Sequence, residues 1–169
     1  MQDLFALAKL IPLSVRELST GYYSEEQIEA ANRYIFGPDT RLIQDGTYFV
    51  AMDGSQLVGA GGWGKRKTLF GGDQRRDGQD PLLDPATEPA RLRAFYVHPE
   101  WARRGIASKI VEACFEAARS HGFRNMELLA TLPGEPLYRK FGFEAAEPYS
   151  VPMPGGLTLP CIVMRRTLV

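Results

Sequence analysis

One segment near the middle of the chain constrains the fold and the chemistry more than any other. Residues 95–108 read Phe-Tyr-Val-His-Pro-Glu-Trp-Ala-Arg-Arg-Gly-Ile-Ala-Ser. An apolar strand pattern ends at Val97, and Pro99 stops it because proline has no amide proton for a strand ladder. A tight loop then leads to Gly105, where a long amphipathic helix begins. The segment therefore predicts a strand, a turn and a helix in direct succession.

The start of this helix has the composition of an anion-binding site. The first amides of a helix have no partner inside it, and the helix dipole adds about half a positive charge there. Gly105 leaves the main chain open to a ligand, and Arg103 and Arg104 add two positive charges. We therefore expect a phosphate or pyrophosphate to bind here. The pattern is neither a P-loop nor a Gly-x-Gly-x-x-Gly dinucleotide motif.

Hydrophobic periodicity along the rest of the chain predicts a mixed α/β protein built around one sheet. Strands are predicted at 14–18, 47–52, 56–63, 91–97, 126–130, 143–145 and 157–165. Helices are predicted after the Ser24–Gln27 capping box, from Gly105 to His121, and at 136–141. In the 91–97 strand, strict alternation predicts two faces. One face carries Leu92, Ala94 and Tyr96, and the other carries Arg91, Arg93, Phe95 and Val97.

Two glycine-rich stretches interrupt this pattern. Gly59, Gly61 and Gly62 lie inside a predicted strand, where glycine indicates close approach of another backbone or a ligand. Residues 65–89 form a long irregular stretch with several arginines and lysines. A loop of this length in a compact domain is a solvated loop, a substrate lid, a dimer contact or a disordered segment. The sequence leaves these alternatives open.

Composition excludes several classes of protein. The chain has 169 residues, which suit a single domain over 1–169, and its 20 basic and 20 acidic side chains balance. A net charge of zero argues against a protein whose main function is to bind nucleic acid or an anionic membrane. Cys114 and Cys161 are too few and too isolated for a disulfide framework or a zinc site. For the same reason we expect no bound metal. The N-terminus lacks the features of a signal peptide, so we expect a cytoplasmic protein.

Together, two motifs resemble the GNAT superfamily of N-acetyltransferases. The first is Gln/Arg-x-x-Gly-x-Gly/Ala between a strand and a helix, which matches 102–107 except at Ala102. The second is Tyr-x-x-x-Gly-Phe, which is met by Tyr138, Gly142 and Phe143. The strongly matching region spans 92–143, and the order of elements fits most of the rest. The resemblance implies the GNAT acyl-CoA N-acyltransferase fold, a central mixed sheet flanked by helices.

The resemblance also implies roles for individual residues. Acetyl-CoA would lie between the strand that ends at Val97 and the strand at 126–130, with its acetyl and pantetheine arm on the main chain of Phe95 and Val97. Tyr138 would be the general acid that protonates the departing thiolate. The implied cofactor-binding residues are Phe95, Tyr96, Val97, Arg103, Arg104, Gly105, Ile106, Ala107, Ser108 and Thr131. Thr131 stands where many relatives have an asparagine.

The general base is not identified by the sequence. Relatives often have a glutamate or histidine where this chain has Arg91 and Arg93, and arginine stays protonated. The two arginines are instead candidates to bind a carboxylate or phosphate on the acceptor. Glu25, Glu26, Tyr22, Asp73 and His98 are candidate bases, and a chain of water molecules that carries the proton is the alternative.

The implied reaction is direct transfer of an acetyl group from acetyl-CoA to the primary amine of a small molecule. A protein or peptide acceptor is an alternative, and so is an acyl-CoA sensor without catalysis. The resemblance also favours a homodimer formed through the C-terminal strands.

Overall fold

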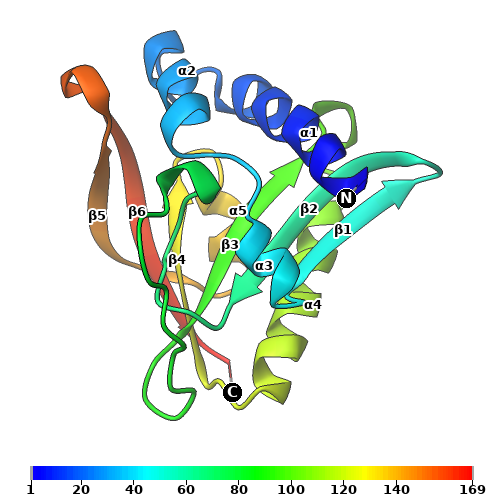
Figure 1. Cartoon of the computed structure of the whole chain (residues 1–169), viewed down its shortest axis with the longest axis vertical. Helices are drawn as coiled ribbons and strands as arrows, with labels where there is room; N and C mark the ends of the chain where they lie inside the picture. The colour runs from blue at the N-terminus through cyan, green and yellow to red at the C-terminus, as the bar shows by residue number, and fades with distance from the viewer. Residues whose placement is uncertain (1, 169) are drawn as a thin grey trace.

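The computed structural model describes residues 2–168, which form a six-stranded mixed sheet with helices on both faces (Figure 1). The strands are β1 (Tyr48–Asp53), β2 (Gln56–Gly64), β3 (Ala90–Val97), β4 (Asn125–Thr131), β5 (Glu144–Pro152) and β6 (Thr158–Thr167). Their order in the sheet is β1-β2-β3-β4-β6-β5. The central β3–β4 pair is parallel and the other pairs are antiparallel. The predicted fold class is confirmed.

Helices cover the two faces of the sheet. They are α1 (Gln2–Ser19), α2 (Glu25–Tyr34), α3 (Thr40–Gln44), α4 (Ile106–Ser120) and α5 (Glu135–Lys140). The buried side chains of α4 pack on β2, β3 and β4, and α5 packs beside them. On the opposite face, α1 packs on β2 and β3, while α2 packs on β5 and β6 (Figure 1). Within residues 2–168, none of the helices has the length and apolar character to cross a membrane.

The predicted first strand at 14–18 is wrong, because this stretch is the last part of helix α1. Leu7, Leu10, Ile11 and Val15 are buried, and their spacing of three and four places them on one helical face. The short alternation at 14–18 resembles a strand only when the earlier apolar positions are ignored. Packing of the whole stripe against the sheet therefore decides the structure of this segment.

The predicted capping box at Ser24 is confirmed. The Ser24 hydroxyl accepts a hydrogen bond from the Gln27 amide, and the Gln27 side chain accepts one from the Ser24 amide. The helix that follows buries Ile28 and Ala31 against the cores on this face. The next helix, α3, was not predicted from the sequence. It is five residues long, and Asp39 caps its first amides.

Residues 65–89 are irregular apart from one short 3₁₀ turn at Asp73–Arg75. The two ends of the segment pair with each other, because Lys67 N–H donates to Pro81 O and Leu83 N–H donates to Lys65 O. Near its tip, Gly72 N–H donates to Ile35 O at the end of α2. The buried Leu83 side chain anchors the segment in the core beneath α4. These contacts make the segment an ordered part of the fold.

Candidate active site

The two central parallel strands pair over only a short distance. Ala90 of β3 lies opposite Met126 of β4 and Arg91 opposite Glu127, and the register ends there. Beyond these residues β4 continues to pair with β6 as far as Thr131. The second half of β3 therefore has β2 on one side and no strand on the other. Main-chain groups on that side have no strand partner, so a ligand that lies along the strand could pair with them.

A β-bulge in β3 changes which way its side chains face. Ala94 has a left-handed backbone with φ of 59°, and the register against β2 shifts at this point. The predicted alternation is therefore wrong across the bulge. Leu92 and Phe95 both pack with the α4 core, whereas Ala94 and Tyr96 pack with the α1 core.

Close packing around the bulge explains one of the glycines of β2. A β-carbon on Gly61 would lie 2.8 Å from the Phe95 ring, so only glycine lets that ring lie against the strand. On the other side of the bulge, the Tyr48 hydroxyl donates a hydrogen bond to the Ala94 carbonyl at 2.9 Å. The bulge is thus held by the space that Gly61 of β2 leaves and by a hydrogen bond from Tyr48 of β1.

The loop between β3 and α4 is the place where the sequence predicts an anion cradle. Arg103 and Gly105 both have left-handed backbones, with φ of 62° and 83°. Gly105 is the N-cap of α4 and has no side-chain cap. The first hydrogen bond of the helix runs from Lys109 N–H to Gly105 O, so the amides of residues 106–108 precede the intrahelical ladder. The arrangement presents main-chain N–H groups next to two arginines.

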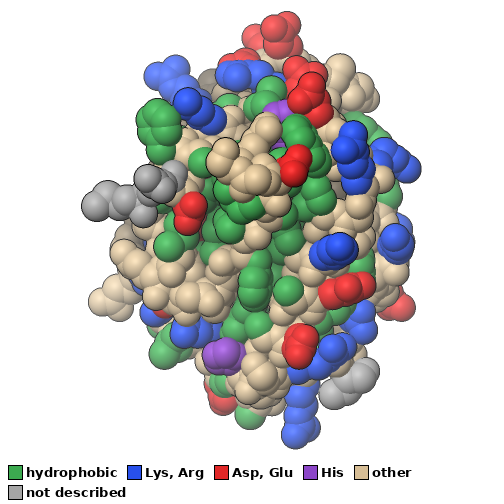
Figure 2. Space-filling view, turned by 90° about the vertical axis from the view of Figure 1, so that its right-hand side faces the viewer, with side chains coloured by type: hydrophobic (Ala, Val, Ile, Leu, Met, Phe, Trp, Pro, Cys, Tyr) green, Lys and Arg blue, Asp and Glu red, His purple; other side chains and the backbone are tan. Residues whose placement is uncertain are grey.

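The surface around α4 suits an anionic ligand with an apolar arm. Arg103, Arg104 and Lys109 are exposed, whereas Ile106, Ala107 and Ser108 are half-buried. Ile106 packs against β2, where a β-carbon on Gly59 would lie 2.6 Å from its side chain. Figure 2 shows this side of the molecule, with a hydrophobic band down its middle and lysines and arginines gathered along one margin. The charges are available to solvent, and apolar groups lie beside them.

Tyr138 lies close to the end of β3. Its ring contacts the Phe95 ring edge-on, with centroids 6.3 Å apart, and it also contacts Phe143. Gly134 separates Tyr138 from Thr131, because a β-carbon there would lie 3.3 Å from the Tyr138 ring and 3.2 Å from the Thr131 hydroxyl. Burial raises the pKa of the Tyr138 phenol well above its ordinary value of 10. The phenol is therefore protonated throughout the physiological range and can donate a proton.

Tyr96 is placed differently from the other residues predicted to hold the cofactor. Its ring is buried under α1 and contacts Phe36 edge-on. Its main chain lies opposite Ala60 of β2. The side chain therefore contributes to the core on the α1 side of the sheet.

Tyr23, which the sequence did not single out, holds the end of β4. Its hydroxyl donates to Pro160 O at 2.6 Å and accepts from Leu132 N–H at 2.9 Å. These two bonds connect the start of α2 with the turn that follows Thr131. The local sequence around Tyr23 gives no sign of this role, since both partners lie more than 100 positions away.

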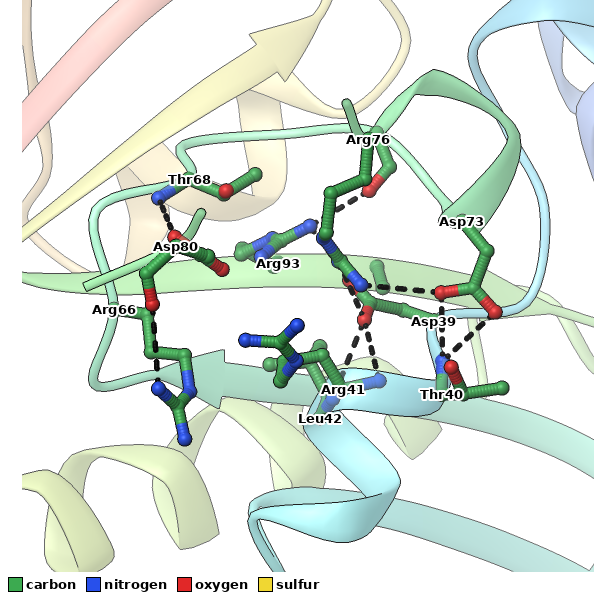
Figure 3. A network of polar contacts seen from close by, with 12 residues as sticks. Asp39, Thr40, Arg41, Leu42, Arg66, Thr68, Asp73, Arg76, Asp80 and Arg93 are labelled. Carbon is green, nitrogen blue, oxygen red and sulfur yellow. Dashed lines mark hydrogen bonds and ion pairs between the residues drawn. The ribbon is translucent and has the colours of Figure 1, made fainter. Parts of the chain in front are cut away.

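Arg93 is buried in an ion-pair network rather than exposed to a ligand (Figure 3). Its guanidinium donates to Asp39 Oδ2 at 2.6 Å and to the Gly71 carbonyl at 2.6 Å. Asp39 also accepts from Arg76 at 2.8 Å while it caps α3. The side chain of Arg93 is 2% exposed and that of Asp39 is 0% exposed. This network fastens the 65–89 segment and α3 to β3.

Arg91 is also ion-paired. Its guanidinium lies 3.0 Å from Glu127 on β4, and Glu127 is shared with Arg165 on β6. Burial lowers the pKa of both Arg91 and Arg93, and the neighbouring carboxylates oppose this shift. Both arginines therefore keep their charge beside a carboxylate partner.

The candidate bases lie in different surroundings. Asp73 accepts from the Thr40 amide and pairs with Arg76. His98 caps a 3₁₀ turn, with its Nδ1 accepting from the Glu100 amide at 3.2 Å. Tyr22 is 53% exposed in the turn between α1 and α2, and the two glutamates at the start of α2 are also exposed. Among the described residues 2–168, the hydrogen bonds of Asp73 and His98 are made with other partners, and the ring neighbours of Tyr138 are Phe95 and Phe143.

The two cysteines are buried and free. Burial raises the pKa of the Cys114 thiol on α4, and it raises that of Cys161 to about 11. Both thiols are therefore protonated and poorly nucleophilic at neutral pH. Among the residues from 2 to 168, three or more His, Cys, Asp or Glu side chains nowhere gather in a way that could hold a metal ion.

The site combines a split parallel strand pair, a bulge, helix amides outside the intrahelical ladder beside two arginines, and the phenol of a partly buried tyrosine. A family model described as the acetyltransferase (GNAT) family matches residues 13–143. The chain therefore belongs to the GNAT acetyltransferase family, as its two motifs predict. It is an acyltransferase enzyme, and acetyl-CoA is the donor that this family membership supports.

Solved structures agree on the fold. A GCN5-related N-acetyltransferase from Rhodopseudomonas palustris superposes with a TM-score of 0.71 at 19% identity, covering 98% of this chain and 90% of that one. PaiA N-acetyltransferase from Thermoplasma acidophilum, in complex with coenzyme A, gives 0.66 at 17% identity, with 98% and 93% covered. YncA from Salmonella typhimurium, with its cofactor acetyl-CoA, gives 0.60 at 14% identity, with 99% and 91% covered. Comparison with curated proteins gives no match.

Proposed function

We propose that this protein transfers the acetyl group of acetyl-CoA directly to the primary amine of a small molecule, with Tyr138 as general acid. The observation that carries the proposal is the open side of β3 between the bulge and the anion cradle. It offers main-chain groups for an extended arm at one end and unpaired helix amides for a pyrophosphate at the other. The residues present thus fit acetyl-CoA, which supplies an activated thioester.

In this proposal each residue of the chain has a distinct task. Phe95 and Val97 orient the acyl arm through their main-chain groups, and the amides from Arg103 to Ser108 bind the pyrophosphate. Tyr96 lies between Phe95 and Val97 and holds the strand end against the α1 core through its ring, and Thr131 offers a hydroxyl near Gly134. Tyr138 holds a proton on its phenol oxygen and gives it to the departing thiolate.

The proposal for acceptor binding is less specific. Arg91 and Arg93 stay candidates for binding an acidic group on the acceptor, although Glu127 and Asp39 already hold their guanidinium groups. We also propose a single domain over 1–169, a cytoplasmic location and a homodimer through the C-terminal strands. Two buried free thiols suit a reducing compartment, and β5 is an edge strand.

The first experiment is a thermal-shift titration with acetyl-CoA, with CoA and ATP as controls. A ligand at about 100 times its Kd adds roughly 2.7 kcal/mol of stability. We expect a clear rise in melting temperature with acetyl-CoA and a smaller one or none with ATP. Thiol release is then measured over a panel of small amines and a matched panel of peptides. Turnover confined to peptides would contradict the small-molecule acceptor, and binding without any turnover would contradict catalysis.

A further inference from the structure

Helix α1 reaches the open side of β3 at Ser14. This serine lies on the apolar face of α1 and is 4% exposed. Its hydroxyl oxygen accepts a hydrogen bond from the Val97 amide at 3.2 Å, although the two residues are 83 positions apart. A side chain of a helix therefore takes the place of a neighbouring strand.

The Val97 amide belongs to the side of β3 that faces away from β2. The next amide, of His98, donates to Val58 O of β2 at 2.8 Å. Successive amides of a strand point in opposite directions, so the Val97 amide points to the other side. Pairing with β4 has ended at Arg91, six positions earlier in the strand. Ser14 is thus the partner of a main-chain donor on the side proposed for the acyl arm.

We propose that Ser14 is a positioning residue that holds the Val97 amide in the free enzyme and releases it to a carbonyl of the acetyl-CoA arm. This inference rests on the proposed function. A serine hydroxyl in a helix can rotate to donate a hydrogen bond to the carbonyl four residues earlier. For Ser14 this second partner is the carbonyl of Leu10. Release therefore leaves no hydroxyl buried without a hydrogen bond. The hydroxyl keeps a part-buried donor satisfied until the arm arrives.

This arrangement has a definite thermodynamic consequence. In the free enzyme, removing the hydroxyl takes the Ser14 partner from the part-buried Val97 amide and destabilises the fold. In the complex the amide is satisfied by the arm, so the loss of the hydroxyl costs little. Removal of the hydroxyl therefore raises the free energy of the free enzyme but not that of the complex. Acetyl-CoA binds more tightly as a result. If the hydroxyl instead donated a hydrogen bond to the arm, its removal would weaken the binding of acetyl-CoA.

The test compares Ser14→Ala with Ser19→Ala in the full chain. Ser19 is a matched control, because it lies in the same helix and is 6% exposed, while its backbone carbonyl serves the turn that follows. Calorimetric titration with acetyl-CoA should show Ser14→Ala binding about 2- to 10-fold more tightly than the wild type. Its free form should melt about 2–6 °C lower. Hydrogen exchange of the Val97 amide should be faster in the free variant and equal to the wild type in the complex.

Each other outcome has one meaning. Equal affinity of Ser14→Ala and wild type overturns the inference alone, and weaker binding shows instead that the hydroxyl holds the arm. No binding by the wild type overturns the proposed function, and the inference fails with it. Should Ser14→Ala not fold, Ser14→Cys keeps the volume with a much weaker acceptor and must change affinity in the same direction.

Discussion

Strand β3 is shared by two regions that are built in contrasting ways. Beyond the bulge, the proposed donor site uses main-chain groups of the strand and of the first turn of α4. Before the bulge, the strand is held by buried side-chain charges, with Arg93 bound to Asp39 and Gly71 under the 65–89 segment. One region is defined by backbone conformation and the other by charge pairing.

The difference teaches where each region is vulnerable. A main-chain site tolerates changes of side chain as long as the backbone keeps its shape. A buried ion pair tolerates little, because removing one partner leaves the other charged and desolvated. The donor region should therefore respond to substitutions through binding and catalysis, whereas the network should respond through stability.

The largest expected effect is on catalysis and comes from Tyr138→Phe. Loss of a general acid typically costs about 10²–10⁴ in rate, so kcat should fall by that factor while the KM for acetyl-CoA changes little. Because burial raises the pKa of this phenol above 10, wild-type activity should not decline between pH 8 and about 10 through its ionisation. Steady-state thiol release as a function of pH measures both quantities.

A matched control for this variant is Tyr34→Phe, since Tyr34 lies at the exposed end of α2. It should leave kcat and KM as in the wild type. If Tyr138→Phe retains most of its activity, Tyr138 is a packing residue against Phe95 and the proposed acid role is wrong.

The largest expected effect on stability comes from Asp39→Ala. This change leaves Arg93 charged and buried and also removes the cap of α3, so we expect a loss of about 3–5 kcal/mol in the free energy of unfolding. Urea denaturation measures it. Asp77→Asn, an exposed change in the 65–89 segment that the network holds, should stay within about 0.5 kcal/mol of the wild type.

The double variant Asp39→Leu with Arg93→Met sharpens this test of the network. Replacing both charges with apolar groups should recover part of the stability lost by Asp39→Ala, because no unpaired charge stays buried. A loss below about 1 kcal/mol for Asp39→Ala itself would mean that the network does not hold the segment in place.

The same contrast explains what the sequence predicts well. The Ser24 capping box and the glycine start of α4 are local, since each depends on residues a few positions apart, and both are present in the structure. The motifs at 102–107 and 138–143 likewise identify the family. Local patterns thus predict much of the fold and the main-chain part of the candidate site.

The features that the sequence missed depend on partners far along the chain. Asp39 meets Arg93 across 54 positions, and Ser14 meets Val97 across 83. The bulge at Ala94 depends on the space that Gly61 leaves on the neighbouring strand. Strict alternation cannot anticipate such a bulge, which is why the predicted faces of β3 were wrong. Tertiary packing determines these features, and the local sequence does not encode them.

The smallest of the predicted effects separates backbone strain from ligand binding in the donor region. Gly105 has φ of 83°, and a β-carbon there would have no atom within 4 Å. The cost of Gly105→Ala is therefore conformational and amounts to about 1–2 kcal/mol of stability. Gly46 is a matched control, because it has φ of 71° and equally open surroundings after α3. Urea denaturation should show similar losses for Gly46→Ala and Gly105→Ala.

Acetyl-CoA binding should distinguish the two glycine variants. A β-carbon on Gly105 stands at the amides of the anion cradle, whereas one on Gly46 lies at a turn that belongs to neither half of the proposed site. We expect Gly105→Ala to raise the Kd for acetyl-CoA about tenfold, close to 1.4 kcal/mol, and Gly46→Ala to leave it unchanged. Equal Kd values for the two variants would mean that the cradle does not bind the pyrophosphate. In that case the positive φ at Gly105 serves the turn between β3 and α4, and the main-chain site is confined to the strand.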